Sequence, residues 1–306
     1  MARAAVAEVA RAVLLMWFAT LAAFAIVRAM PADPAVLALM AFGLPTDAQT
    51  LAALRAQWGL DRPLPVQYFV WLGDFVTGDW RRSFRTGEPI LAEFAARLPT
   101  SLAIGFGGLA LALAFVRPMA VGAARRPMGI AARLLDAATL GAQAVPAFWL
   151  GCLLIWLFAV EWRIIDIFGE GPSRYVLPIL IVAFTGLGPL AQVYRASLAE
   201  VGRSDYLRTA LAKGVDPETA LHAQGKRYAS LGLSAALTAE AGWIVGGTTV
   251  VEIVFGLPGI GHFLADSIAV RDYFVLQSYI VVAVAWMLAI ALAAAAARRL
   301  LDPRER

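Results

Sequence analysis

The chain has 306 residues, of which 60% are hydrophobic and only 16% are charged, and its mean hydropathy is +0.71. Soluble domains carry about 25% charged residues, so this composition excludes an ordinary soluble domain and predicts an integral membrane protein. The net charge of +4 does not indicate an acidic partner, because the placement of the basic residues follows membrane orientation.

Six apolar runs are each long enough to cross a hydrocarbon core of roughly 30 Å as a helix. Backbone groups in lipid must be bonded within the segment, and the runs lack the alternation of barrel strands. The expected fold class is therefore an all-α integral membrane protein with six transmembrane helices. In chain order, the expected spans are Val9–Val27, Leu98–Val121, Ala137–Val160, Tyr175–Val193, Leu231–Phe255 and Phe274–Ala297.

Basic residues are unevenly shared between the segments that join these spans. Most of the 26 Lys and Arg residues lie on the side that holds both termini. The other side has its basic residues mainly in one long loop, and long loops count for little in the positive-inside rule. Both termini are therefore expected in the cytoplasm. A cleaved secretory signal is less favoured, because the first apolar run is too long and its removal would invert the charge bias.

The longest segment expected outside the membrane, residues 31–97, contains two predicted helices. Thr46 or Asp47 can cap a helix whose apolar positions continue to Trp58 at helical spacing. After a break at Pro63, a second amphipathic helix is expected to lie on the membrane surface. This extracytoplasmic loop is therefore predicted to be a folded cap and not a linker.

A second long segment, residues 195–228, is expected in the cytoplasm and is rich in polar and small residues. Tyr206, Ala210 and Lys213 share one helical face, and Gly214 followed by Asp-Pro predicts a helix stop and restart. Two short helices meeting at a corner could dock in a groove of another protein. Composition alone equally allows a solvated loop that carries positive-inside charge.

The motif in this segment favours docking. The string YRASLAEVGRSDYLRTALAKG resembles the cytoplasmic signature of permease subunits of ATP-binding-cassette importers, in the dipeptide, oligopeptide and nickel family. In that family the string forms the coupling helix that docks on the ATPase subunit. The matching residues are Arg195, Ser197, Glu200, Asp205, Tyr206, Thr209, Ala210, Ala212, Lys213 and Gly214. The resemblance implies ATPase coupling by Asp205, Tyr206, Arg208, Thr209, Ala210, Ala212, Lys213 and Gly214.

The resemblance covers nearly the whole chain. Further strings follow in the family's order, and they are GDWRRSFRTGEPI, RLPTSL, VPAFWLG, VVEIVFGLPGIG, RDYFVLQ and the terminal LLDPR. It implies the importer permease fold as a single transmembrane domain over residues 1–306. Three positions depart from the family pattern: Gly232 replaces a proline, Arg117 replaces an apolar residue before a proline, and Glu240 replaces a frequent glutamine.

No catalytic constellation is evident in the sequence. The chain has two histidines, His222 and His262, and one cysteine, Cys152, without the spacing of a metal site or a nucleophile and base. The string QGKR lacks the upstream glycine and the following Ser or Thr of a phosphate loop. We therefore expect a non-catalytic subunit with no metal site and no cofactor of its own, with ATP and Mg²⁺ bound by partner ATPase subunits.

Glu240 is the most conspicuous charged residue, because a carboxylate in the middle of a span is costly. It is expected either to face the translocation path or to form a structural pair with Arg117, and both roles can hold together. Arg117 also lies close enough to its helix end to snorkel toward the interface.

An outer turn is expected after the fifth span. Glu252 could cap or tie the GLPGIG turn that follows, so Glu252, Pro258, Gly259 and Gly261 are the expected outer gate. The glycines would permit a tight backbone path there.

The resemblance implies a multi-pass protein of the bacterial inner membrane that works by alternating access. It also implies a second permease in a heterodimer, two cytoplasmic ATPases and an extracytoplasmic binding protein as partners. Nucleic acid is not an expected partner. The rivals are a proton-coupled secondary transporter with Glu240 as relay, and an intramembrane enzyme. The substrate class is a peptide, nickel or a metal chelate, and the style of the outer loop leans to nickel or a metal chelate.

Overall fold

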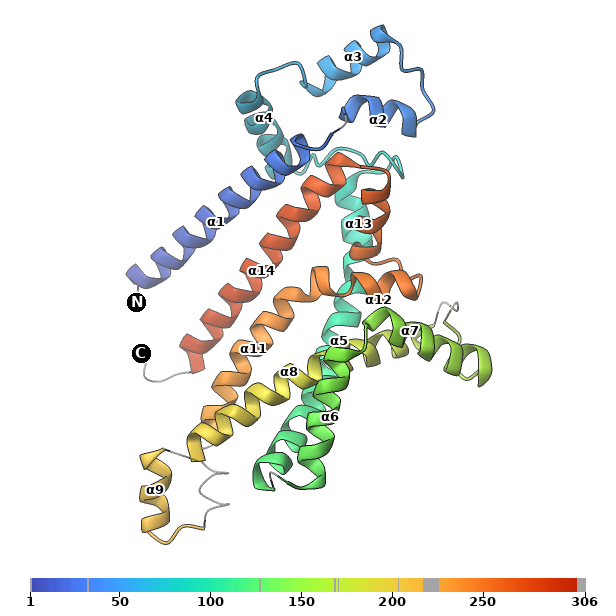
Figure 1. Ribbon diagram of the computed structural model, residues 1–306. Helices are drawn as coiled ribbons and strands as arrows, with labels where there is room; N and C mark the ends of the chain where they lie inside the picture. The colour runs from blue at the N-terminus through green and yellow to red at the C-terminus, as the bar shows by residue number, and fades with distance from the viewer. Residues whose placement is uncertain are drawn as a thin grey trace. The chain divides into compact units, whose positions relative to one another are not determined.

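The computed structural model describes residues 2–31, 33–126, 128–167, 169, 171–202, 204–216 and 226–301. Over these residues the regular structure is helical, apart from an isolated antiparallel bridge between Arg82 and Pro89 (Figure 1). The all-α prediction is therefore confirmed for the described part of the chain. The chain divides into two compact units, formed by residues 1–100 with 258–292 and by residues 101–257 with 293–306.

The first unit contains two long apolar helices, α13, the start of α5, and the helices of residues 31–97, the segment expected outside the membrane and here called the outer loop. They are α1 Ala2–Arg28, α2 Pro34–Ala41, α3 Ala48–Trp58, α4 Leu64–Thr77, the beginning of α5 Ile90–Arg125, α13 Ile260–Ala269, and α14 Tyr273–Leu301 as far as residue 292.

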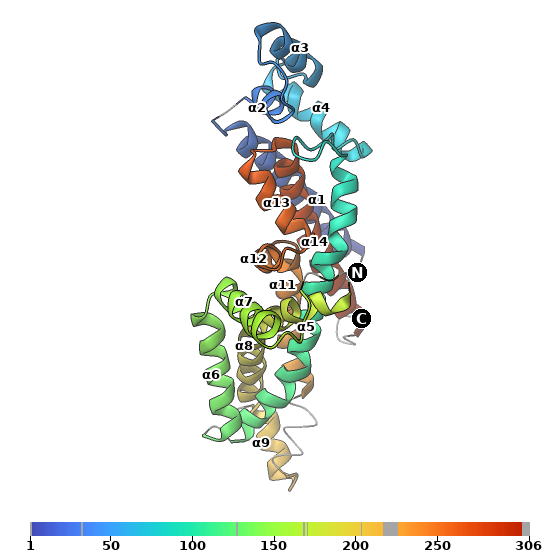
Figure 2. The same cartoon turned by 90° about the vertical axis from the view of Figure 1, so that its right-hand side faces the viewer.

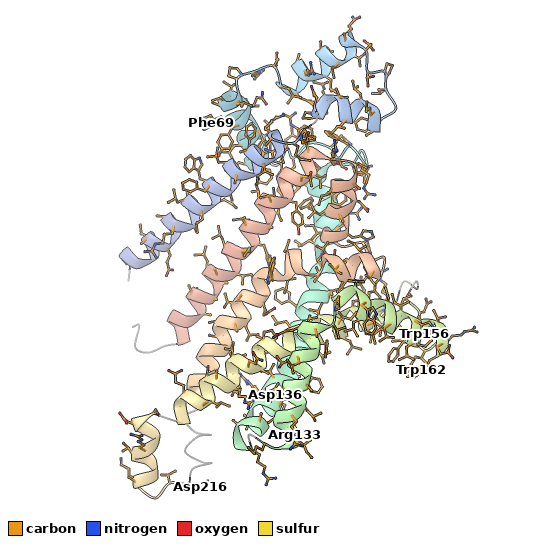
Figure 3. The ribbon with its side chains drawn as sticks, in the orientation of Figure 1. Phe69, Arg133, Asp136, Trp156, Trp162 and Asp216 are labelled. Carbon is orange, nitrogen blue, oxygen red and sulfur yellow. The ribbon has the colours of Figure 1, made fainter. Side chains whose placement is uncertain are left out.

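The two helices predicted within residues 31–97 are present as α3 and α4, and local signals explain them. Asp47 caps α3 by accepting hydrogen bonds from the backbone N–H groups of Gln49 and Thr50. Gly59 ends α3 in the left-handed conformation, with φ of 67°. On α4, the exposed Phe69 points away from the helix, which fits an amphipathic helix at a membrane surface (Figure 3).

Two further helices of the first unit were not predicted. The first, α2, begins after Asp33, whose carboxylate accepts a hydrogen bond from Ala35 N at 2.8 Å. The second, α13, follows Gly259, which was expected only as part of a turn. Both helices are short and begin at or close to a proline. They therefore lack the long periodic pattern from which a helix is predicted.

The core of the first unit lies where α1, α4 and α14 meet. Phe24 packs against Tyr68 and Trp71, and Val281 of α14 closes the cluster. Thr20 shares a 2.8 Å hydrogen bond with the Tyr68 hydroxyl. The outer helix α4 is thus attached to the spanning helices by buried aromatic side chains.

The second unit contains the remaining helices. They are the rest of α5, α6 Ile130–Ala144, α7 Ala147–Ile155 with a π-helical continuation Trp156–Glu161, a 3₁₀ turn Pro172–Tyr175, α8 Val176–Gly202, α9 Asp205–Ala212, α11 Lys226–Gly247 and α12 Thr249–Val254.

Five helices are long and apolar enough to cross a membrane, and a bent pair raises the number to six within the described residues. The five are Val6–Arg28, Ile90–Ala124, Pro172–Val201, Gly232–Val254 and Tyr273–Ala297. They coincide with five of the six predicted spans.

The prediction of one continuous helix over Ala137–Val160 is wrong. The segment forms α6 and α7, whose axes differ by 100°. Val145, which precedes Pro146, adopts an extended conformation with φ of −95° and ψ of 117°. Steric conflict with the proline ring disfavours the helical conformation at that position, so the helix ends before the proline and restarts after it.

The predicted span Leu231–Phe255 also changes direction. Thr248 separates α11 from α12, and α12 turns away from the axis of α11 (Figures 1 and 2).

The core of the second unit is formed mainly by α5, α6 and α8. Tyr194, Leu190 and Leu198 of α8 are buried in it. Gly188 lets α8 approach α6 closely, because a Cβ there would lie 2.9 Å from the backbone Cα of Thr139. Buried small residues of this kind are typical of helix contacts in membranes.

Candidate transport and coupling sites

A pocket of about 330 Å³ lies within the second unit, among α5, α8, α11 and α12. Its walls are mainly apolar and include Ile181, Trp243 and Ile244. The polar lining includes Glu240, Thr185 and Thr248. A mostly apolar pocket with a few polar groups is the usual form of a small-molecule site.

Glu240 lines this pocket and is half-buried. Arg117, the candidate partner, is exposed and does not line it. Among the described side chains no ion pair joins these two residues, so the proposed structural pair is not formed within this chain. The place of Glu240 on a translocation path stays a prediction.

One end of the pocket is fixed by a buried hydrogen bond. The Thr248 hydroxyl donates to Glu252 Oε1 at 2.6 Å, and Glu252 is fully buried. The hydroxyl also lies 3.0 Å from the carbonyl oxygen of Ile244 in the preceding turn. Glu252 therefore joins α12 to the end of α11.

The turn after Glu252 differs in detail from the expected outer gate. Its left-handed residue is Gly256, with φ of 61°, and Leu257 N donates to the carbonyl oxygen of Glu252 at 2.9 Å. Gly259 has φ of −93° and precedes α13, while Gly261 lies buried inside that helix. The position that requires glycine in the VVEIVFGLPGIG string is thus 256, and Gly256 was not among the residues predicted for the gate.

The predicted coupling segment forms a helix, α9, that ends where the sequence predicts. Lys213 N donates to Thr209 O at 3.2 Å, and Gly214 then has φ of 80°. The side chains of Asp205 and Arg208 are 97% and 79% exposed, although they approach each other to 3.5 Å. The side chains of Tyr206 and Ala210, and the predicted restart of the helix at Pro217, lie outside the described residues.

The segment before α9 is attached to the body of the second unit. Arg195 on α8 forms an ion pair with Asp136 on α6 at 2.9 Å. The motif singled out Arg195 but gave no partner, and Asp136 was missed. An acidic residue at the expected cytoplasmic end of the neighbouring span was the available signal.

Among the described residues, no group of three or more His, Cys, Asp or Glu side chains could hold a metal ion. His222 lies outside the described residues, whereas Cys152 is an exposed free thiol.

Two family models match the chain. The model described as "Binding-prot-dependent transport system membrane comp, N-term" matches residues 1–105, and the model described as "Binding-protein-dependent transport system inner membrane component" matches residues 117–306. The chain belongs to this family. It is therefore a permease component of a peptide-type, binding-protein-dependent ABC importer, and a multi-pass protein of the bacterial inner membrane.

Curated relatives match most of the permease. It is 30% identical over 292 residues to the "Probable peptide ABC transporter permease protein y4tP" of Sinorhizobium fredii, covering 92% of each chain. It is 34% identical over 258 residues to the glutathione transport system permease protein GsiC of Escherichia coli K12, covering 84% of this chain and 83% of the relative. The corresponding protein of Pectobacterium atrosepticum is 33% identical over 256 residues, covering 83% of each chain. These relatives give no support to a secondary transporter.

Proposed function

We propose that this permease carries a short peptide, in the size range of glutathione, from a binding protein into the cytoplasm. The observation that carries the proposal is the Glu240 pocket, in a chain whose relatives are named for peptide and glutathione transport. None of the three relatives described above is named for nickel transport, so the proposal does not extend to nickel or a metal chelate.

The proposed path includes the Glu240 pocket. A peptide brings an α-ammonium group, a cation that no described residue supplies to the Glu240 carboxylate in its apolar pocket. Ionised Glu240 would therefore orient the peptide by its amino end. Transport by alternating access further requires that the substrate bind the outward and inward states with different free energies.

We further propose that the permease pairs with a second permease and two ATPases, which bind ATP and Mg²⁺. Exposed apolar residues on and beyond α7 support the presence of a neighbouring protein at this surface. Trp149, Trp156 and Trp162 are each more than half exposed. Figure 3 shows Trp156 and Trp162 at the end of this segment, directed away from the rest of the unit. The exposed polar side chains of α9 support docking on an ATPase.

Uptake measurements test the substrate class and the role of Glu240. Cells that express the complete transporter should take up a labelled tripeptide, and N-acetylation of the tripeptide should weaken uptake. Glu240→Gln should lower uptake of the free peptide about tenfold, because a charge-assisted contact is lost. The same substitution at the exposed Glu161 is the matched control. Equal uptake of the free and acetylated peptides by wild type would refute the role of Glu240, and uptake of nickel alone would refute the substrate class.

Docking by α9 is tested at Ala212, which is exposed. Ala212→Trp should leave membrane insertion intact but uncouple ATP hydrolysis from transport, because bulk prevents close approach. Ala212→Ser is the matched control and should behave as wild type. Normal transport and co-purification of the ATPase with the Ala212→Trp protein would exclude docking at this surface.

The orientation follows from the same proposal. With Cys152→Ser as background, an introduced cysteine at the exposed Val66 should react with an impermeant reagent in intact cells. A cysteine at Asp216 should react only after the membrane is opened. Labelling of position 216 from outside would reverse the proposed topology.

A further inference from the structure

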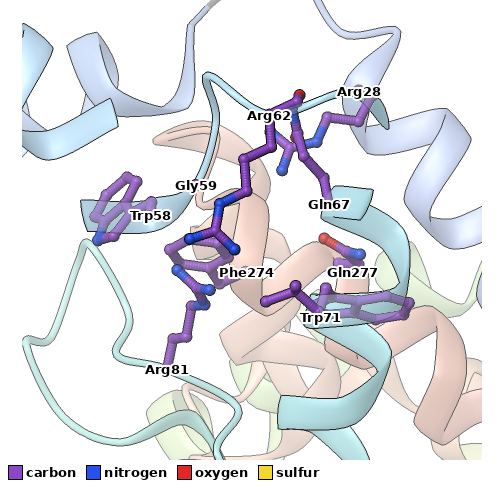
Figure 4. Close-up of a pocket in the computed structure, with 10 residues that line it drawn as sticks. Arg28, Trp58, Gly59, Arg62, Gln67, Trp71, Arg81, Phe274 and Gln277 are labelled. Atoms are coloured by element: carbon purple, nitrogen blue, oxygen red, sulfur yellow. The ribbon is translucent and has the colours of Figure 1, made fainter. Parts of the chain in front are cut away.

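A second, much smaller pocket lies in the first unit. It is formed by the end of α1, the segment after α3, α4 and the first turn of α14 (Figure 4). Its volume is about 20 Å³. A cavity needs about 10–15 Å³ of this volume to hold one water molecule. The pocket therefore has room for one water molecule or one ion of similar size, and not for a peptide.

The charge of this pocket is entirely positive. Arg28, Arg62 and Arg81 line it, and no carboxylate is among its lining residues. Arg81 reaches Asp74 outside the pocket at 3.3 Å. The exposed Arg62 makes no side-chain hydrogen bond or ion pair to any other described residue. Three guanidinium groups therefore converge on a small space, and the carboxylates near them, Asp74 beside Arg81 and Asp33 near Arg28, lie outside the pocket lining.

A buried donor also faces this space without a partner. Gln277 is only 3% exposed and lines the pocket, yet its Nε2 has no hydrogen-bond partner among the described residues. The same holds for the buried Nε of Arg28. Leaving a buried donor unpaired costs about 1–3 kcal/mol, so such groups are normally satisfied.

The neighbouring Gln67 has a defined orientation. Its Nε2 donates to the carbonyl oxygens of Leu60 and Arg62 at 3.0 and 2.7 Å. The amide thereby holds the segment that carries Arg62, and its own Oε1 is left without a partner in the described structure. A water molecule could serve the two glutamines, but it would bring no negative charge to the three guanidinium groups that line the space.

We propose that this pocket binds one small anion, either a halide ion or one oxygen of a carboxylate, between the three arginines and Gln277. A bound anion would satisfy the buried donors and offset the repulsion between the guanidinium groups. It would also connect α1, α4 and α14, so its occupancy would steady the outer loop. This role is independent of which substrate the transporter carries.

The test is the thermal stability of the full-length chain, purified in detergent, during titration with sodium chloride or sodium acetate. Ionic strength is held constant with a morpholinoethanesulfonate salt, so a saturable rise in Tm shows that the added anion binds more tightly than the sulfonate that it replaces. At least one of the two anions should raise Tm saturably. A response to chloride alone identifies a halide site, and a response to acetate alone identifies a carboxylate site.

Two variants and one control locate the effect. Arg62→Gln and Gln277→Met should each weaken the apparent anion affinity about tenfold, because each removes one donor. Arg82→Gln removes an exposed arginine of the same loop that does not line the pocket, and it should titrate as wild type. Absence of a saturable response to either anion, or an unchanged response in both pocket variants, would overturn the proposal and leave the pocket to water.

Discussion

The two long loops of this permease are built in different ways. In the outer loop, Trp58 stacks on Phe84 with ring centroids 5.4 Å apart, and both rings contact Phe274. Asp272 accepts hydrogen bonds from the Ser83 hydroxyl and Phe84 N at 2.6 and 2.7 Å. In the segment that contains α9, the described polar side chains of that helix bond to their own helix or remain exposed.

The difference shows where each loop obtains its stability. The outer loop is fixed by buried contacts within its own unit, so its shape is decided by this chain. The described part of α9 has local hydrogen bonds and exposed polar side chains, which suits a surface completed by another protein. Substitutions should therefore affect stability in the outer loop and coupling in α9.

The largest effect is expected at Asp272. Asp272→Ala should lower the free energy of unfolding by about 2 to 4 kcal/mol, because two buried donors lose their acceptor. Thermal or denaturant unfolding in detergent measures the change. The control is Asp266→Ala, which removes a partly exposed ion pair with Arg85 and should cost less than about 1 kcal/mol. Equal losses in the two variants would contradict the anchoring role of Asp272.

A contact in the second unit should give an intermediate effect. At Gly232, a Cβ would lie 2.5 Å from Ser197 Oγ but 3.6 Å from Ser197 Cβ. Gly232→Ala should therefore push the Ser197 hydroxyl out of its 2.9 Å hydrogen bond to Val193 O and destabilise the fold by less than about 1 kcal/mol.

Ser197→Ala supplies the control, because it removes the oxygen that the new methyl group would meet. Unfolding of both single variants and the double variant gives the coupling. If Ser197→Ala fails to restore stability to Gly232→Ala, the close approach of α8 and α11 at this point is not the cause.

A smaller effect concerns pH. Burial raises the pKa of Asp272 above its ordinary value of 3.8, although hydrogen bonds from Ser83, Val275 and Phe84 lower it in part. The folded protein thus binds this proton more tightly than the unfolded chain. The stability that this tighter proton binding adds to the folded state is fully present below pH 3.8, and it is lost as pH rises through the raised pKa of Asp272.

Relative to Asp272→Asn, wild type should therefore gain stability as pH falls from 7 toward 4. The measurement is the difference in Tm between the two proteins across this range. A difference that moves against wild type on acidification would show that the hydrogen bonds, and not burial, dominate the pKa.

The smallest effect is expected at Asp205 on α9. Asp205→Ala should leave the Tm of the isolated chain unchanged, because its partner Arg208 is exposed and such pairs contribute little. Transport and ATPase association of the assembled complex are measured in parallel. A clear loss of stability in the isolated chain would remove the contrast between the two loops.

Elements governed by local chemistry could be predicted from the sequence. Hydropathy was sufficient to predict five of the spans as helices, because backbone groups in lipid must bond within their own helix. Asp47 marked the beginning of α3 and Gly214 marked the end of α9, since capping depends on neighbours only a few residues away. The motif around residues 195–214 indicated the family because its residues are contiguous.

Features that join distant residues needed the tertiary structure. Ser83 and Asp272 are 189 residues apart, and nothing local to either indicates the other. The same holds for Ser197 opposite Gly232, for Asp136 opposite Arg195, and for the arginines around Gln277. Pro146 lies inside the predicted span Ala137–Val160, and only the structure shows that the helix breaks there with a 100° bend. Burial and pairing are properties of the assembled helices, because they depend on which faces meet and not on the order of residues along one segment.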